Sequence, residues 1–89
     1  MAVRKRVRAH GRVQGVFFRD SVRRAADSVG VSGWAANRPD GTVEAVFEGE
    51  ADAVERLVAL CGRGPGAAEV TRLDVGDEEP EGLRGFEVR

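Results

Sequence analysis

Residues 3–13 alternate between small apolar and basic side chains almost without interruption, and this pattern constrains the fold more than any other. One face of the segment carries Val3, Lys5, Val7, Ala9, Gly11 and Val13, and the other carries Arg4, Arg6, Arg8, His10 and Arg12. A period of two is typical of a β-strand, because successive side chains of a strand point to opposite faces. The pattern therefore predicts a strand with one buried and one solvated face, and the buried face requires a second layer to cover it.

Two later segments have the period of an α-helix. Their apolar residues recur at the spacing i, i+3, i+4 and i+7: Val22, Ala25, Ala26 and Val29 in residues 19–29, and Val54, Leu57, Val58 and Cys61 in residues 51–61. This spacing places the apolar side chains on one stripe of an amphipathic helix. Gly30 is suited to the left-handed conformation that ends many helices. The second helix is expected to be ended by the run of Gly62, Gly64, Pro65 and Gly66.

Four further segments favour strands, namely residues 31–38, 42–50, 68–75 and 86–88. Between the first two, Pro39 and Gly41 predict a tight turn, because proline presets one dihedral angle and glycine accepts a positive φ. The apolar residues of the 68–75 segment do not keep one period, so a β-bulge or an edge position is expected there. The acidic residues 76–85 are expected to form a loop.

The order strand, helix, strand, strand, helix, strand, with a short extra C-terminal strand, predicts an α+β fold. Two amphipathic helices can cover the apolar face of one antiparallel sheet, which is the ferredoxin-like two-layer sandwich, βαββαβ. A length of 89 residues fits a single domain over residues 1–89. Fold alone does not indicate function, because many unrelated functions use this arrangement.

The charges are unevenly distributed along the chain, although the net charge is only −1. Residues 1–38 carry nine basic and two acidic side chains, and residues 39–89 carry five basic and thirteen acidic ones. Such asymmetry can indicate binding of nucleic acid or another anion. The alternative, which we favour, is that basic and acidic strands become neighbours in the sheet and neutralise each other.

Cysteine content and hydropathy indicate the cellular compartment of the protein. Cys61 is the only cysteine, so no intrachain disulfide can form and a reducing compartment, the cytoplasm, is expected. No apolar run approaches the roughly 20 residues of a membrane helix, and the basic start of the chain does not lead into a secretory signal. We expect a monomer that binds no membrane and no nucleic acid.

The turn at residues 14–18 joins the first strand to the first helix and is the best candidate for an anion site. Backbone N–H groups in such a turn can converge on an anion, and the helix N-terminus adds partial positive charge. Arg19 can add a planar guanidinium that matches phosphate, although an arginine at a helix start is often only exposed. Asn37, at the end of a strand, has an amide that can orient a water, although asparagine also commonly begins a turn.

The chain resembles the acylphosphatase family over essentially its whole length. The resemblance rests on residues 11–19 (GRVQGVFFR), 33–37 (GWAAN), 40–45 (DGTVEA) and 85–88 (GFEV). It implies hydrolysis of acyl phosphates, with Arg19 as the catalytic residue that binds the phosphate and Asn37 as the one that positions the attacking water. It also implies phosphate contacts from the main chain of the turn, at Gln14, Gly15, Val16, Phe17 and Phe18. Ala35 and Ala36 stand where the family often has bulkier or basic residues.

The chemistry implied by this resemblance requires no cofactor and no metal. A carboxylate leaving group departs without protonation near neutral pH, so positioning and charge stabilisation of the phosphoryl group are sufficient. We expect His10 to be a solvated strand residue, Cys61 to be structural, and Trp34 to pack near a strand end. We expect Phe17 and Phe18 to anchor the turn to the core.

Three other functions stay open at this point. The first is a nucleic-acid-binding module, which exposed aromatic side chains on such a sheet would favour. The second is a non-catalytic module that binds an anion without turnover. The third is a relative of the acylphosphatase-like domain of carbamoyltransferase maturation proteins, which the absence of a zinc-finger segment disfavours.

Overall fold

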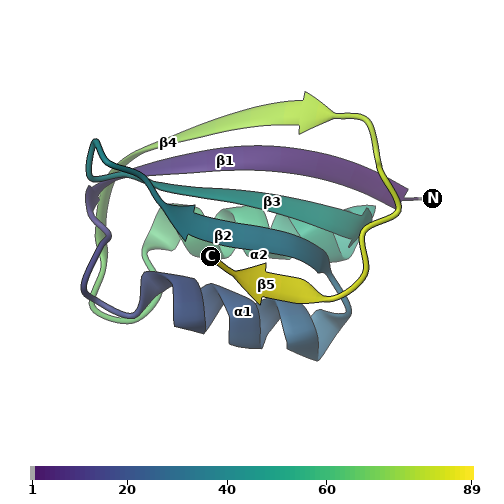
Figure 1. Cartoon of the computed structure of the whole chain (residues 1–89), viewed down its shortest axis with the longest axis horizontal. Helices are drawn as coiled ribbons and strands as arrows, with labels where there is room; N and C mark the ends of the chain where they lie inside the picture. The colour runs from purple at the N-terminus through teal and green to yellow at the C-terminus, as the bar shows by residue number, and fades with distance from the viewer. Residues whose placement is uncertain (1) are drawn as a thin grey trace.

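The computed structural model describes residues 2–89 and consists of one five-stranded sheet with two helices (Figure 1). In chain order the elements are β1 (Ala2–Arg12), α1 (Phe18–Val29), β2 (Ser32–Asn37), β3 (Val43–Glu50), α2 (Ala51–Arg63), β4 (Glu69–Glu78) and β5 (Phe86–Val88). The expected ferredoxin-like order of strands and helices is therefore confirmed. Of the two helices that the structure describes within residues 2–89, neither is long and apolar enough to cross a membrane.

The strands lie in the order β4-β1-β3-β2-β5. The first four strands pair antiparallel, as expected, but β5 runs parallel to β2, so the sheet as a whole is mixed. The path of the chain explains this difference. After β4 the chain crosses one end of the sheet to the opposite edge (Figure 1), so β5 must run back against the direction of β4. Strands β1 and β2 also run opposite to β4, so β5 is parallel to both.

Both helices pack on one face of the sheet and enclose the main core there (Figure 1). The apolar face of β1 contributes Val7 and Ala9, and Phe47 on β3 lies at the centre, all at most 1% exposed. The two helices contribute the residues that their periodicity predicts, including Val22 and Leu57. Burial of such side chains is the main favourable term in the stability of the fold.

The other face of the sheet is covered by ion pairs instead of helices. Arg4 on β1 is only 5% exposed, and its guanidinium donates to Glu78 on β4 at 2.8 Å and to Glu48 on β3 at 3.4 Å. The next arginine on this face, Arg6, pairs with Glu44 at 2.6 Å and with Glu78. The expected neutralisation of basic by acidic strands is thus confirmed. The prediction of a solvated second face is wrong at Arg4, because three carboxylates and the segment after β4 cover it.

Trp34 also lies on this second face, where it packs against Ala36, Val46 and Leu83. Three guanidinium groups approach its ring, those of Arg6 and Arg38 at 5.5 Å and that of Arg89 at 4.7 Å. The ring is therefore covered by side chains, as expected for a packing residue, and does not form an open platform for base stacking.

Two element boundaries differ from expectation by more than one residue. Helix α2 continues through Gly62 to Arg63 and ends at Gly64, which adopts a left-handed conformation. A glycine inside a helix costs only about 1 kcal/mol relative to alanine, so the surrounding helix overrides it. Strand β4 extends to Glu78, because its acidic residues pair with the basic residues of β1, and the loop is limited to residues 79–85. The predicted bulge and edge position are both confirmed: β4 is an edge strand, and its register with β1 shifts between His10 and Gly11.

Candidate functional site

The turn between β1 and α1 leaves several backbone donors without partners. Gly15 has φ +73° and Phe17 has φ +60°, so both residues adopt a left-handed conformation. No acceptor within residues 2–89 is hydrogen-bonded to the backbone N–H groups of Gly15, Val16 or Phe17. Free N–H groups next to a helix N-terminus form a site that favours an anion.

A cavity of about 370 Å³ opens beside this turn. Five of the residues predicted for the site line it: Gly15, Phe17, Phe18, Arg19 and Asn37. Both β2 and β5 end near the start of α1 (Figure 1), which brings Asn37 and Val88 to the same cavity. Its volume is within the usual range for a site that binds a small molecule.

Arg19 lies in the first turn of α1, and its side chain is hydrogen-bonded to residue 89. Its Nη1 donates to the backbone carbonyl oxygen of Arg89 at 2.5 Å. Its other guanidinium N–H groups bond no acceptor in the described part of the chain, so they are available to an anion in the cavity. A guanidinium can present two parallel donors to a phosphate.

Asn37 is the last residue of β2, and its exposed side chain reaches the cavity. Its amide has no hydrogen bond to another residue of the 2–89 range, so it can both donate to and accept from a bound water. The following turn is well ordered, because the Arg38 N–H donates to the Thr42 carbonyl at 2.9 Å. The hydroxyl and the backbone N–H of Thr42 donate to Asp40 and lower the pKa of that carboxyl.

Gln14 connects the two halves of the site, a role that the sequence did not reveal. Its Nε2 donates to the carbonyl oxygens of Arg38 at 2.8 Å and Thr42 at 2.9 Å. This side chain therefore ties the 14–18 turn to the β2–β3 turn, directly beside Asn37. The only signal in the sequence was a polar, hydrogen-bonding side chain in an otherwise apolar turn.

The charges that line the cavity are mainly positive. Arg19 and Arg23 carry positive charge, and Asp20 is the one acidic lining residue among those described. The carboxylate of Asp20 is already paired, because it accepts two hydrogen bonds from Arg24 at 2.6 and 3.1 Å. Within residues 2–89 no three His, Cys, Asp or Glu side chains are grouped so that they could hold a metal ion.

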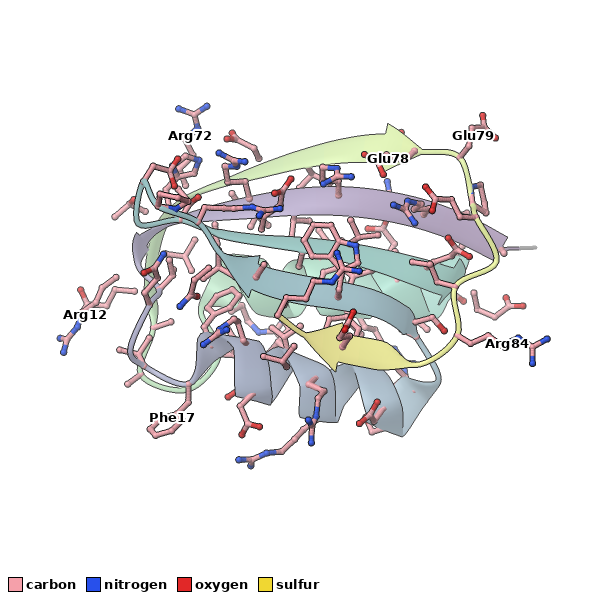
Figure 2. The ribbon with its side chains drawn as sticks, in the orientation of Figure 1. Arg12, Phe17, Arg72, Glu78, Glu79 and Arg84 are labelled. Carbon is pink, nitrogen blue, oxygen red and sulfur yellow. The ribbon has the colours of Figure 1, made fainter. Side chains whose placement is uncertain are left out.

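Two of the predicted phosphate-binding residues do not line the cavity. Gln14 uses its side chain as described above, and the side chain of Val16 belongs to the core. The expectation that both phenylalanines anchor the turn holds for Phe18, which is 2% exposed. It is wrong for Phe17, which is 80% exposed and projects from the start of α1 (Figure 2). The left-handed backbone at Phe17 turns the ring away from the core.

The other two side chains considered in the sequence also have defined environments. Cys61 is fully buried, as expected for a structural residue, and burial raises the pKa of its thiol to about 12. A thiol with this pKa is not a nucleophile near neutral pH. His10 is not simply solvated, because its Nε2 lies 2.9 Å from a carboxylate oxygen of Asp74 on β4.

Comparisons with known proteins show the family of the chain. The sequence model of the acylphosphatase family matches residues 5–88. A protein from Rubrobacter xylanophilus named acylphosphatase is 62% identical in an 89-residue alignment that covers 96% of this chain and 80% of the relative. A Thermococcus kodakarensis acylphosphatase is 58% identical over 88 residues, with 94% and 97% covered.

A solved structure shows the same likeness in three dimensions. The acylphosphatase from Coxiella burnetii superimposes with a TM-score of 0.93 at 36% identity, over 99% of this chain and 93% of that one. Sequence and structure thus agree over nearly the full length of both chains. The chain therefore belongs to the acylphosphatase family, whose members are enzymes that hydrolyse acyl phosphates.

Proposed function

We propose that the chain hydrolyses the carboxyl-phosphate bond of small acyl phosphates in this cavity, with Arg19 binding the phosphate and Asn37 orienting the attacking water. One observation carries the proposal. The same cavity combines an arginine with free donors, an amide without a partner, and a turn whose N–H groups bond no acceptor. These are the groups that transfer of a phosphoryl group to water requires.

The phosphate lies against the 14–18 turn in this proposal. The backbone N–H groups of the turn and the N-terminus of α1 surround its oxygens, and Arg19 adds a charged donor from the side. Because the transition state of phosphoryl transfer is loose, negative charge is spread over the equatorial oxygens. Donors held in place before the reaction stabilise that charge without reorganisation.

Asn37 acts on the other reactant. Its amide oxygen accepts a hydrogen bond from the water and its amide nitrogen can donate one, which orients a lone pair toward phosphorus. Gln14 holds the 14–18 turn and the turn after Asn37 together. The distance between the bound phosphate and the water is thereby kept constant.

The leaving group needs no help from the protein. A carboxylate departs without a proton near neutral pH, so neither a general acid nor a covalent nucleophile is called for. The reaction gives a carboxylate and inorganic phosphate, with the oxygen of water on the phosphate.

Hydrolysis of benzoyl phosphate, followed by ultraviolet absorbance with a chelator present, tests the proposal. The panel contains wild type, Arg19→Ala, Asn37→Ala and, as the matched control, Arg84→Ala, an exposed arginine on the 79–85 loop (Figure 2). Arg19→Ala is expected to lower kcat about 100- to 1,000-fold, the usual loss for one transition-state donor, and to abolish inhibition by inorganic phosphate. Asn37→Ala should lose turnover but keep that inhibition, and Arg84→Ala should behave as wild type.

The outcomes separate the roles. A nearly active Asn37→Ala variant would exclude the role of Asn37 in positioning water. Equal losses in Arg19→Ala and Arg84→Ala would show that only general positive charge matters. A folded wild type that binds phosphate without turnover would identify a non-catalytic anion-binding module.

A further inference from the structure

We infer that Arg23 forms a second anion-binding position in this cavity and makes the chain prefer acyl phosphates whose acyl group carries an additional negative charge. The inference rests on the proposed function, because it concerns the acyl end of the substrate whose phosphate Arg19 would bind. Its basis is the placement and the partners of the charged side chains around the cavity.

Arg23 follows Arg19 by four residues on α1. Residues at this spacing lie on one face of a helix, about 6 Å apart along its axis. Both side chains line the same cavity. A ligand that meets Arg19 with its phosphate can therefore meet Arg23 with a group one helical turn away.

The charge of Arg23 is not neutralised by the protein. It forms no ion pair or hydrogen bond with another residue of the described chain. The nearby carboxylate of Asp20 could pair with it but is bound by Arg24, at 2.6 Å from Nη2 and 3.1 Å from Nε. Asp20 and Arg24 thus neutralise each other, and Arg23 keeps its full charge for a ligand.

The part of the cavity that a phosphate does not fill suits a hydrocarbon. The cavity of about 370 Å³ is larger than a phosphate group of five heavy atoms needs, at about 30 Å³ for each water-sized group. Phe17 and Val88, which are both exposed, supply apolar surface to its lining. The arrangement therefore fits a ligand with a phosphate at one end, an apolar middle and a second anion, carboxylate or phosphate, at the other end.

Two substrates that differ only in this charge test the inference. The first is 3-carboxybenzoyl phosphate, and the second is its neutral isostere 3-carbamoylbenzoyl phosphate. Values of kcat/KM for both are measured with wild type, Arg23→Gln and, as the matched control, Arg56→Gln, at low salt and in 0.5 M NaCl. For each protein we take the ratio of kcat/KM for the carboxylate substrate to kcat/KM for the amide substrate. Dividing the ratio of a variant by that of wild type cancels the different reactivity of the two leaving groups.

Arg23→Gln is expected to lose about 3- to 5-fold more activity on the carboxylate substrate than on the amide, mainly through KM. That factor is what an ion pair at a partly exposed site supplies. High salt should shrink the preference of the wild type, since the pair is open to solvent. Arg56→Gln removes an equal charge from an exposed residue of α2 that does not line the cavity, and should leave the ratio within twofold of wild type.

Each outcome decides the question. Equal losses on both substrates in Arg23→Gln would overturn the inference, and so would an equal change of the ratio in Arg56→Gln, which would indicate only the general positive charge of the protein surface. Loss of the carboxylate preference in Arg23→Gln alone would support it. A phosphate-type second anion is tested with 3-phosphonobenzoyl phosphate, for which the same dependence on Arg23 is expected. Absence of benzoyl phosphate turnover in wild type would overturn the proposed function itself, whereas turnover without a dependence on Arg23 would overturn this inference alone.

Discussion

The side-chain amide nitrogen of Gln14 donates a hydrogen bond to the backbone carbonyl oxygen of Arg38, 2.8 Å away and 24 positions later in the sequence. A second bond from the same nitrogen reaches the carbonyl of Thr42 at 2.9 Å. The phosphate-facing turn and the residue after Asn37 are therefore joined by one side chain. In the proposed mechanism, this connection sets the distance between the phosphate at the 14–18 turn and the water at Asn37.

Gln14→Glu should separate positioning from binding. A carboxylate cannot donate to the two carbonyls and repels them, so the free energy of unfolding is expected to fall by about 1–3 kcal/mol. Turnover of benzoyl phosphate should fall while inhibition by inorganic phosphate persists, because Arg19 and the backbone donors stay. As pH falls toward about 4, protonation of the new carboxyl restores a donor and should recover part of the lost stability. Wild-type kcat in this variant would contradict the positioning role.

The environment of Glu48 predicts how the free energy of unfolding depends on pH. Its carboxylate is 6% exposed and accepts hydrogen bonds from the backbone N–H groups of Glu81, Gly82 and Leu83 at 2.7–3.0 Å. Burial alone would raise the pKa of Glu48, but these donors and Arg4 outweigh it and lower the pKa. The stabilisation by Glu48 is therefore complete above the unfolded pKa, about 4.3, and is lost as pH falls through the lower folded value.

Glu48→Gln is the corresponding test. The variant should lose about 2–4 kcal/mol in urea unfolding at pH 7, since backbone donors and Arg4 lose a charged acceptor. The difference from wild type should stay constant down to about pH 5 and shrink only at lower pH, where wild type is protonated as well. A difference that is independent of pH down to pH 2 would show that the carboxylate charge is not the cause.

Gly33 and Gly62 predict opposite effects of the same substitution. A Cβ on Gly33, where φ is +143°, would lie 1.8 Å from the carbonyl oxygen of Val46 on the neighbouring strand. Gly33→Ala should therefore destabilise by more than about 4 kcal/mol or prevent folding. A Cβ on Gly62 within α2 meets only a side-chain methyl of Leu73 at 3.7 Å, so Gly62→Ala should stabilise by about 0.5–1 kcal/mol. Thermal unfolding of the two variants checks both signs, and a stable Gly33→Ala protein would exclude the close strand approach.

Phe17 offers a test of backbone strain without a loss of core packing. Its ring is exposed while its backbone is left-handed, a conformation that costs most residues about 1–2 kcal/mol and costs asparagine less. Phe17→Asn should therefore be about 1 kcal/mol more stable than Phe17→Ala, which keeps the unfavourable conformation. Chemical unfolding of both variants measures the difference. An asparagine variant no more stable than the alanine variant would show that the left-handed conformation at this position costs little.

The local features of this protein followed from its sequence. The period of two in residues 3–13 and the helical period in residues 19–29 and 51–61 predicted three elements correctly, because periodicity reports which side chains share a face of one element. The turn signal at Pro39 and Gly41 likewise depends on the dihedral angles of those residues alone. The family resemblance selected Arg19 and Asn37, and the fold brings both to one cavity.

Only the tertiary structure decided which residues meet across the fold. The sequence placed Arg4 on a solvated face, but Glu48 and Glu78 come to it from strands β3 and β4 and bury it. The parallel direction of β5 depends on the end of the sheet at which the chain crosses. The bond from Gln14 to Arg38 and the unpaired charge of Arg23 depend in the same way on strand register and on competing partners. Periodicity carries no information about such contacts, because they join residues that are distant in sequence and are selected only when the sheet and helices pack together.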